Sequence, residues 1–214
     1  MPKVKICGVR RPEDITFVNK YLPEYIGFVF AKSKRRITAE YAHVLAAGLD
    51  RRIKKVGVFV NEDLGEVIRI VKACSLDAVQ IHGDEQPEYV LNLKRELQNK
   101  RGLYENSTEV WKAVRIKNTD SLAALKSYIA DAYVLDAWVE GSYGGAGACF
   151  DWNIAAQARE YGKIVLAGGL NEANAKKAVE AVKPYALDVS SGVETEGVKD
   201  EAKIRAFINT VRSY

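Results

Sequence analysis

Short apolar runs alternate with amphipathic segments along the whole chain. Eight runs are rich in β-branched and apolar residues and predict strands. They cover residues 4–8, 25–31, 54–60, 78–83, 110–116, 132–138, 163–169 and 186–192. Successive runs start about 21 to 32 residues apart, which is the size of one βα unit. This alternation predicts a parallel sheet with right-handed crossovers and helices outside it.

The segments between the runs carry residues typical of helix starts. Proline is favoured in the first turn, and Ser, Thr, Asp and Asn are favoured just before it. Four such signals precede Ala-, Glu- or Leu-containing stretches, at Pro12, Thr38, Pro87 and Asn171. We therefore expect eight helical segments, one after each strand.

Eight βα units close naturally into a (β/α)₈ TIM barrel, although an open doubly wound sheet has the same local pattern. The first βα turn reads CGVRRPED and lacks the G-x-G-x-x-G of such open sheets. At 214 residues the chain fits one α/β barrel domain, residues 1–214. The longest gap, 99–108, is interpreted as a helix-to-strand loop on the face opposite the chemistry.

Composition narrows the functional class and the compartment. The net charge of +4 comes from 32 basic and 28 acidic residues spread along the chain, so no nucleic-acid-binding arm is expected. No run reaches the roughly 20 apolar residues of a membrane helix, and the start does not resemble a signal peptide. Three cysteines without a C-x-x-C pair favour a reducing cytoplasm, and two histidines argue against a metal site.

In a barrel of this kind the active site forms at the carboxyl ends of the strands. The reactive or phosphate-friendly residues at these positions are Cys7, 32–36, His82, Asp136, 141–148, Gly168, Gly169 and 190–192. Glycine turns after strands seven and eight, LAGGLN and DVSSGVE, are typical of phosphate binding through backbone N–H groups. Ordinary turn chemistry would produce similar sequences.

Cys7 and Asp136 are the candidates for proton transfer. Cys7 lies at the end of the first strand, where a thiol can act as a base or a nucleophile if a positive neighbour or a helix terminus lowers its pKa. We hypothesise that a partly exposed Lys5 beneath it favours the thiolate. Asp136 shares a strand face with Val134 and Trp138, so it should face the barrel mouth, either as a structural hydrogen-bond partner or as a proton-transfer group.

The same alternation predicts polar side chains inside the barrel. They are Lys5, Gln80, Lys112 and Asp188, and we interpret them as a paired polar network in which Asp188 could pair with either lysine. In the segment 32–36, one arginine could hold a carboxylate through its planar fork. His82 could be a general acid, a ligand contact or a satisfied loop residue. Contact with the substrate or its orientation is favoured over a catalytic triad, because no Ser-His-Asp arrangement is visible.

These residues resemble a known family. VKICG, GFVFAKSKR, VGVFVN, VQIHGDE, LDAW followed by YGGAG and FDW, GGL, and DVSSGVE followed by KD are similar in order to the motifs of phosphoribosylanthranilate isomerase. The resemblance spans nearly the whole chain. It implies a cofactor-free Amadori rearrangement of N-(5′-phosphoribosyl)anthranilate to its aminoketose, in tryptophan biosynthesis.

The resemblance also implies roles for single residues. Asp136 is the implied general acid and Cys7 the implied general base, without a metal. The implied substrate-binding residues are Arg35, for the anthranilate carboxylate, His82 and Asp188, near the substrate, and Gly145, Gly147, Gly168, Gly169, Ser190, Ser191 and Gly192, for the phosphate. Arg36 is the neighbouring candidate for the carboxylate. The expected partner is a phosphorylated aminosugar, bound by a monomer or homodimer.

The chain departs from the family pattern at two places. Ala167 replaces a frequent serine, and Ala148-Cys149 replaces a frequent Lys-Thr pair, which affects the expected phosphate loop.

Three alternative functions stay open. A metal-dependent pentulose-phosphate epimerase would need several His and Asp ligands, and the aminoaldose isomerase of histidine biosynthesis would need acidic residues at strands one and five. A barrel that binds phosphorylated ligands without turnover is the third alternative.

Overall fold

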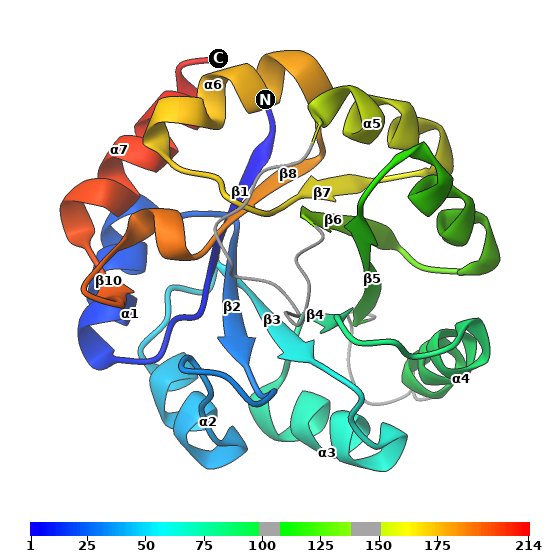
Figure 1. Ribbon diagram of the computed structural model, residues 1–214. Helices are drawn as coiled ribbons and strands as arrows, with labels where there is room; N and C mark the ends of the chain where they lie inside the picture. Colours follow the sequence, from blue (N-terminus) through cyan, green and yellow to red (C-terminus); the bar gives the residue numbers. More distant parts are fainter. Residues whose placement is uncertain (99–107, 138–150) are drawn as a thin grey trace.

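Eight parallel strands form a closed barrel in chain order. The computed structural model describes residues 1–98, 108–137 and 151–214. The strands are β1 (Lys3–Cys7), β2 (Tyr25–Val29), β3 (Lys54–Phe59), β4 (Ala78–Ile81), β5 (Glu109–Ile116), β6 (Ala132–Ala137), β7 (Ile164–Leu166) and β8 (Ala186–Val189). Figure 1 shows these strands as a ring with the helices outside it. The predicted (β/α)₈ barrel is confirmed.

Four of the helices begin at the predicted start signals, and the expected helix between the fifth and sixth strands is a 3₁₀ segment. They are α1 (Pro12–Tyr21), α2 (Ala39–Ala47), α3 (Leu64–Cys74), α4 (Pro87–Gln98), α5 (Trp152–Gln157), α6 (Glu172–Val182) and α7 (Glu201–Arg212), with 3₁₀ segments η1 (Thr119–Ser127), η2 (Ala158–Tyr161) and η3 (Ser191–Val193). Thr38 accepts a hydrogen bond from the Tyr41 N–H, and Asn171 accepts one from the Asn174 N–H. Both are therefore N-caps, because each satisfies a backbone donor of the first turn.

Several strands end earlier than the sequence pattern predicted. β1 ends at Cys7 because Gly8 has φ +81°, a left-handed conformation that leaves the strand. β7 has three residues, and Gly168 and Gly169 then turn the chain with φ +85° and +62°. A short antiparallel hairpin, β9 (Glu194–Thr195) with β10 (Val198–Lys199), follows β8 and was not predicted.

The buried side chains form two layers. An inner layer fills the barrel and contains Tyr25, Val56, Ala78, Trp111, Ala113, Ala132, Val134, Val165, Ala167 and Ala186. The Tyr25 and Trp111 rings meet edge to face at 5.1 Å and 72° in this layer. A larger outer layer, including Ile6, Phe28, Leu135 and Phe207, packs between the strands and the helices. The inner layer fills the barrel with side chains and leaves the polar chemistry to the carboxyl end.

The prediction that Lys112 points into the barrel is wrong. Trp111 and Ala113 lie in the inner layer, so Lys112 between them faces the helices. Its ammonium donates to the Gly83 carbonyl at 2.7 Å and to Glu85 Oε2 at 3.1 Å. The large Trp111 ring decides the orientation of β5, because the barrel interior must be filled with apolar volume.

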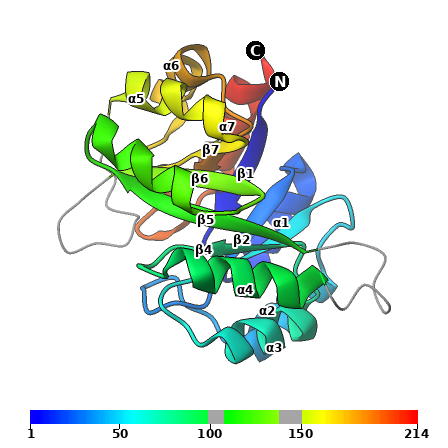
Figure 2. The same ribbon diagram turned by 90° about the vertical axis from the view of Figure 1, so that its right-hand side faces the viewer.

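The barrel closes between the first and the last strand. β1 pairs with β8, and this register puts Lys5 beside Asp188. The two termini lie side by side in both Figure 1 and Figure 2. Within the described ranges, no helix is long and apolar enough to cross a membrane. Most of the predicted loop at 99–108 falls outside the described residues.

Candidate active site

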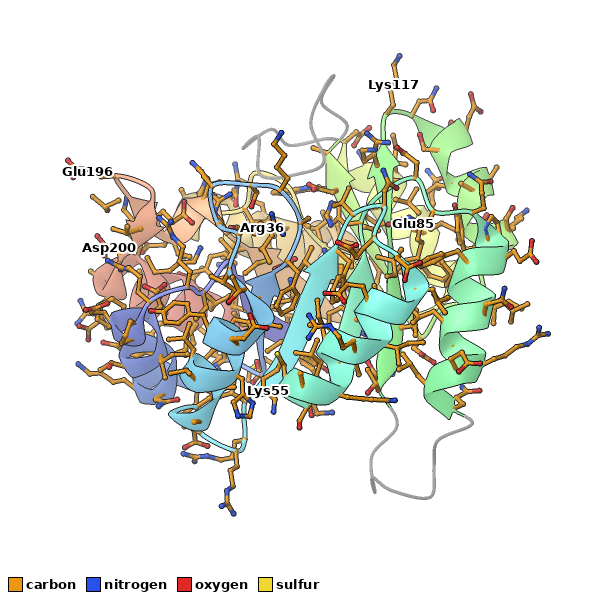
Figure 3. All side chains as sticks on the ribbon, turned by 90° about the horizontal axis from the view of Figure 1, so that it is seen from below. Arg36, Lys55, Glu85, Lys117, Glu196 and Asp200 are labelled. Atoms are coloured by element: carbon orange, nitrogen blue, oxygen red, sulfur yellow. The ribbon has the colours of Figure 1, made fainter. Side chains whose placement is uncertain are left out.

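A cavity of about 560 Å³ lies at the carboxyl ends of the strands. It is lined by Cys7, Val29, Ala31, Lys32, Ser33, Arg35, Val58, Val60, Gln80, His82, Asp136, Ala167, Gly168, Gly169, Leu170, Asp188, Ser190 and Ser191. Figure 3 shows this end of the barrel uppermost, with Arg36 and Lys117 near it and Lys55, close to the start of β3, at the opposite end. The structure thus gathers nine of the twelve predicted site residues around one cavity.

Asp136 is held by two hydrogen bonds at the end of β6. Its side chain is buried, and Oδ1 accepts from its neighbour Ala137 N at 2.9 Å. Oδ2 lies 3.2 Å from His82 Nε2. The backbone turn after β7 passes close by, because a Cβ on Gly168 would lie 2.7 Å from Asp136 Oδ1. The carboxyl group is therefore fixed in orientation.

His82 connects Asp136 to Gln80. Gln80 Nε2 lies 2.7 Å from His82 Nδ1. When the amide donates a hydrogen bond to Nδ1, a neutral imidazole carries its proton on Nε2. This Nε2–H group then donates a hydrogen bond to Asp136. The ring thus contacts the carboxyl group of Asp136, while the expected contact of His82 with the substrate stays a prediction.

Lys5 and Asp188 form a buried ion pair beneath Cys7. Lys5 is fully buried, with 0% exposure, and donates to Asp188 Oδ2 at 2.8 Å. The hypothesis of a partly exposed Lys5 is therefore wrong. A Cβ on Gly27 would lie 2.8 Å from Cys7 Sγ and 3.2 Å from Lys5 Nζ. The thiol and the ammonium group therefore both lie against Gly27. Of the two lysines considered for Asp188, Lys5 is the partner.

Burial and the neighbouring lysines have opposite effects on the pKa of Cys7. Burial is the main cause that raises the pKa of the Cys7 thiol above its ordinary value. Lys5 and Lys199 counteract this effect, and Asp188 adds to it. Burial also disfavours the Lys5 ammonium, yet Asp188 and Cys7 raise its pKa. The net effect favours the protonated thiol and the charged ammonium.

Arg35 does not lie free in the cavity. Its Nε and Nη2 donate to Glu194 Oε1 and Oε2, both at 2.7 Å. Lys199 Nζ donates to the same carboxylate at 2.8 Å. Although burial works against the charged form, Arg35 and Lys199 lower the pKa of Glu194 to about 2. Sequence reasoning missed Glu194 and Lys199, although both lie within the motif DVSSGVE followed by KD.

Two buried acceptor atoms lack partners within the described ranges. Asp188 Oδ1 and Gln80 Oε1 are buried and make no hydrogen bond there. Both residues line the cavity. Since burying an unpaired acceptor is costly, these atoms are suited to accept hydrogen bonds from hydroxyl or N–H groups of a ligand.

The remaining predicted residues differ in their placement. Gly192 does not line the cavity, and a Cβ there would lie 1.9 Å from the Leu170 carbonyl oxygen, so this glycine permits close packing of two turns. Gly145 and Gly147 lie outside the described residues, together with Trp138, Ala148 and Cys149. Among the residues that are described, no group of three or more His, Cys, Asp or Glu could hold a metal ion.

Comparison with known proteins gives consistent matches over the chain. A family model described as N-(5′-phosphoribosyl)anthranilate (PRA) isomerase matches residues 4–210. The N-(5′-phosphoribosyl)anthranilate isomerase of Acetivibrio thermocellus is 55% identical over 213 residues, which are 99% of this chain and 96% of that protein.

Two solved structures are similar over their full length. One is described as mutually generated monomers of the dimeric phosphoribosylanthranilate isomerase from Thermotoga maritima, with 35% identity, a TM-score of 0.82 and 100% coverage of both chains. The other is a phosphoribosylanthranilate isomerase in complex with reduced 1-(o-carboxyphenylamino)-1-deoxyribulose 5-phosphate, with 34% identity, a TM-score of 0.82 and the same coverage.

Proposed function

Because the chain belongs to the N-(5′-phosphoribosyl)anthranilate isomerase family, it catalyses the isomerisation of that compound in tryptophan biosynthesis, and we propose that Cys7 and Asp136 transfer the protons. The product is 1-(2-carboxyphenylamino)-1-deoxyribulose 5-phosphate. The observation that carries the residue assignment is that the two side chains line one cavity from β1 and β6. An acid and a base on separate strands suit a reaction that protonates one atom and deprotonates another.

Asp136 is the general acid in this proposal. It protonates the furanose ring oxygen, the bond from that oxygen to C1′ breaks, and the nitrogen lone pair forms a protonated imine at C1′. The contact with His82 Nε2 at 3.2 Å and the bond from Ala137 N at 2.9 Å support the role, because they fix the direction of the carboxyl group.

Cys7 is the general base. Its thiolate removes the C2′ proton, the electrons of that bond form a C1′–C2′ double bond, and the imine nitrogen becomes neutral. The resulting enolamine transfers its hydroxyl proton to C1′ and becomes the ketone. The Lys5 ammonium beside the sulfur supports the role, because it stabilises the thiolate against burial.

Different residues of the cavity lining are assigned to the two ends of the substrate. Arg35 binds the anthranilate carboxylate. The turns at Gly168 and Gly169 and at Ser190 and Ser191 bind the phosphate, and the family resemblance adds Gly145, Gly147 and Gly192 to this set. Asp188, whose Oδ1 lacks a partner in the described ranges, accepts a hydrogen bond from a sugar hydroxyl. The lining of one cavity by Arg35 together with both turns supports this assignment.

The remaining proposals concern the assembly and the compartment. We propose one barrel domain over residues 1–214, in a cytoplasmic monomer or homodimer that binds neither nucleic acid nor membranes. The dimeric relative supports the homodimer as one of the two states, and the dispersed charges support the absence of a nucleic-acid partner. Sedimentation equilibrium over a hundredfold range of concentration distinguishes monomer from dimer.

The test of the proton-transfer roles uses the fluorescence of the anthranilate substrate, generated in situ, with chemical identification of the aminoketose. We expect rapid loss of the signal with wild-type protein. Asp136→Asn and Cys7→Ser should each lower kcat by about 10² to 10⁴, because each removes a proton-transfer group. Cys74→Ser is the matched control, since Cys74 is buried on α3 and does not line the cavity. Near-wild-type turnover by either active-site variant would exclude its residue from the assigned role.

A further inference from the structure

Arg35 is held by one carboxylate along one edge of its guanidinium group. Nε donates to Glu194 Oε1 and Nη2 donates to Oε2, both at 2.7 Å. The two side chains are 9% and 5% exposed. Such a short, two-point contact between planar groups fixes the rotation of the guanidinium as well as its position.

Glu194 is itself fixed by the hairpin that follows β8. Glu194 in β9 and Lys199 in β10 are partners across the hairpin. Lys199 Nζ donates to Glu194 Oε1 at 2.8 Å and to the Ser190 carbonyl at 3.0 Å, and its side chain is 1% exposed. The carboxylate that holds Arg35 is therefore anchored to the turn that follows β8.

The stem of Arg35 is fixed as well. A Cβ on Gly8 would lie 2.4 Å from Arg35 Cδ, so the arginine passes directly over this glycine. Gly8 follows Cys7 in the chain. Arg35 is thus held between the first βα turn on one side and the β9–β10 hairpin on the other.

One edge of the guanidinium remains for a ligand. The group has five N–H donors, and a carboxylate can bind either at the edge formed by Nε and Nη2 or at the edge formed by Nη1 and Nη2. Glu194 occupies the first edge. The second edge has no hydrogen bond to any residue in the described ranges, and Arg35 lines the cavity.

Building on the proposed role of Arg35, we infer that Glu194 is a positioning residue for substrate binding. It binds one edge of the Arg35 guanidinium and so presents the other edge to the anthranilate carboxylate. Neither Lys199 nor Glu194 lines the cavity. Glu194 is also not among the groups that shift the pKa of Cys7, so we expect it to affect recognition of the carboxylate and not the chemical step.

Two effects of removing the Glu194 charge oppose each other. The net charge around Arg35 would become more positive, which favours an anionic ligand. The guanidinium would also lose its fixed orientation. Arg35 already lowers the pKa of Lys199, and without the carboxylate between them the two cations would repel each other more strongly. Ordering a free arginine on binding lowers affinity by up to about tenfold. Because two buried cations would also separate, we expect the loss of orientation to dominate.

The first experiment compares Glu194→Gln with the matched control Glu196→Gln. Glu196 lies on the same hairpin and is exposed at the edge of the molecule (Figure 3). We expect Glu194→Gln to raise KM about tenfold with kcat within about twofold. Inhibition by inorganic phosphate should not change. An unchanged or lowered KM, or an equal weakening of phosphate inhibition, would overturn the inference, because Glu194 would then act on charge or on the β8 turn.

Two further variants separate this inference from the role of Arg35 itself. Arg35→Met should raise KM, and adding Glu194→Gln should then change kcat/KM by less than about twofold, since Glu194 acts through Arg35. If Arg35→Met leaves KM unchanged, the carboxylate-binding role of Arg35 is wrong, and this inference is wrong with it. Glu194→Asp retains the charge and the fold but shortens the side chain, so it should raise KM by less than Glu194→Gln. A KM equal to that of the Gln variant or higher would contradict positioning through the charged contact.

Discussion

The single residue whose environment most affects the chemistry is Cys7. Four charged groups act on its thiol from the surrounding elements: Lys5 on β1, Asp188 on β8, Lys199 on β10, and Arg35, whose own pKa Cys7 raises. Burial outweighs the favourable charges, so the thiol has a raised pKa. In the proposed mechanism Cys7 is the base, so at neutral pH only a minor thiolate population would be available for it.

This balance predicts a pH dependence for the free enzyme. The kcat/KM should rise with pH, because deprotonation creates the base, and its midpoint should lie above 9.0, the ordinary pKa of the thiol. Alkylation of Cys7 by iodoacetamide, followed by mass spectrometry of its peptide, should have the same midpoint. A midpoint of kcat/KM below 9.0 that alkylation does not share would show that another group is the base.

His82 offers a second prediction at the same scale. His82→Ala removes the contact that orients Asp136, so kcat should fall by up to about 10²-fold while KM changes little. His43→Ala is the control, because this histidine lies on α2 and contacts the Ala73 carbonyl away from the cavity. Steady-state kinetics with the fluorescent substrate measures both constants. A raised KM with unchanged kcat would mean that His82 contacts the substrate instead.

At the scale of helices and strands, local sequence signals were sufficient for most of the fold. Pro12, Thr38, Pro87 and Asn171 mark helix starts in the structure as they do in the sequence. The segment between β5 and β6 is a 3₁₀ helix in which Leu122 and Leu125 are buried. Their three-residue spacing fits the 3₁₀ repeat, and a general apolar pattern does not distinguish this repeat from an α-helix.

The contacts between elements could not be predicted in the same way. Strand parity identified Cys7 and Asp136, but the bond from Arg35 to Glu194 joins residues 159 positions apart. It depends on the hairpin after β8, which has two residues in each strand and leaves little sequence signal. Parity was wrong for Lys112, because the filling of the barrel by Trp111 determines which face of β5 points inward.

The cap of α6 gives a prediction at the scale of the element. Asn171→Ala removes the acceptor of the Asn174 N–H bond at 3.2 Å and should lower the free energy of unfolding by about 1 kcal/mol. Asn209→Ala is the control, because Asn209 is exposed within α7, where alanine is a good helix former. Urea unfolding measures both variants. Equal destabilisation by the two changes would contradict the capping role.

At the scale of the whole molecule, the barrel closes through the pairing of β1 with β8. β1 and β8 are the first and last strands, and Lys5 and Asp188 join them through an ion pair of 2.8 Å whose side chains are 0% and 7% exposed. On the outside, Lys20 and Glu201 also join α1 to α7, but these side chains are 63% and 39% exposed. A buried ion pair contributes to closure mainly because removing either partner would leave the other charge buried and unpaired, which is costly.

Lys5→Met should therefore lower the free energy of unfolding by about 3–5 kcal/mol, because the Asp188 carboxylate would be buried without a cation. Adding Asp188→Leu should recover most of this loss, since an apolar pair of similar volume needs no compensation. Lys20→Met, at the exposed pair, should cost less than about 1 kcal/mol. Urea unfolding at pH 7 measures all three, while the fluorescence assay reports activity separately. If the two changes at Lys5 and Asp188 simply add, the charges act independently, and barrel closure depends on the apolar strand contacts alone.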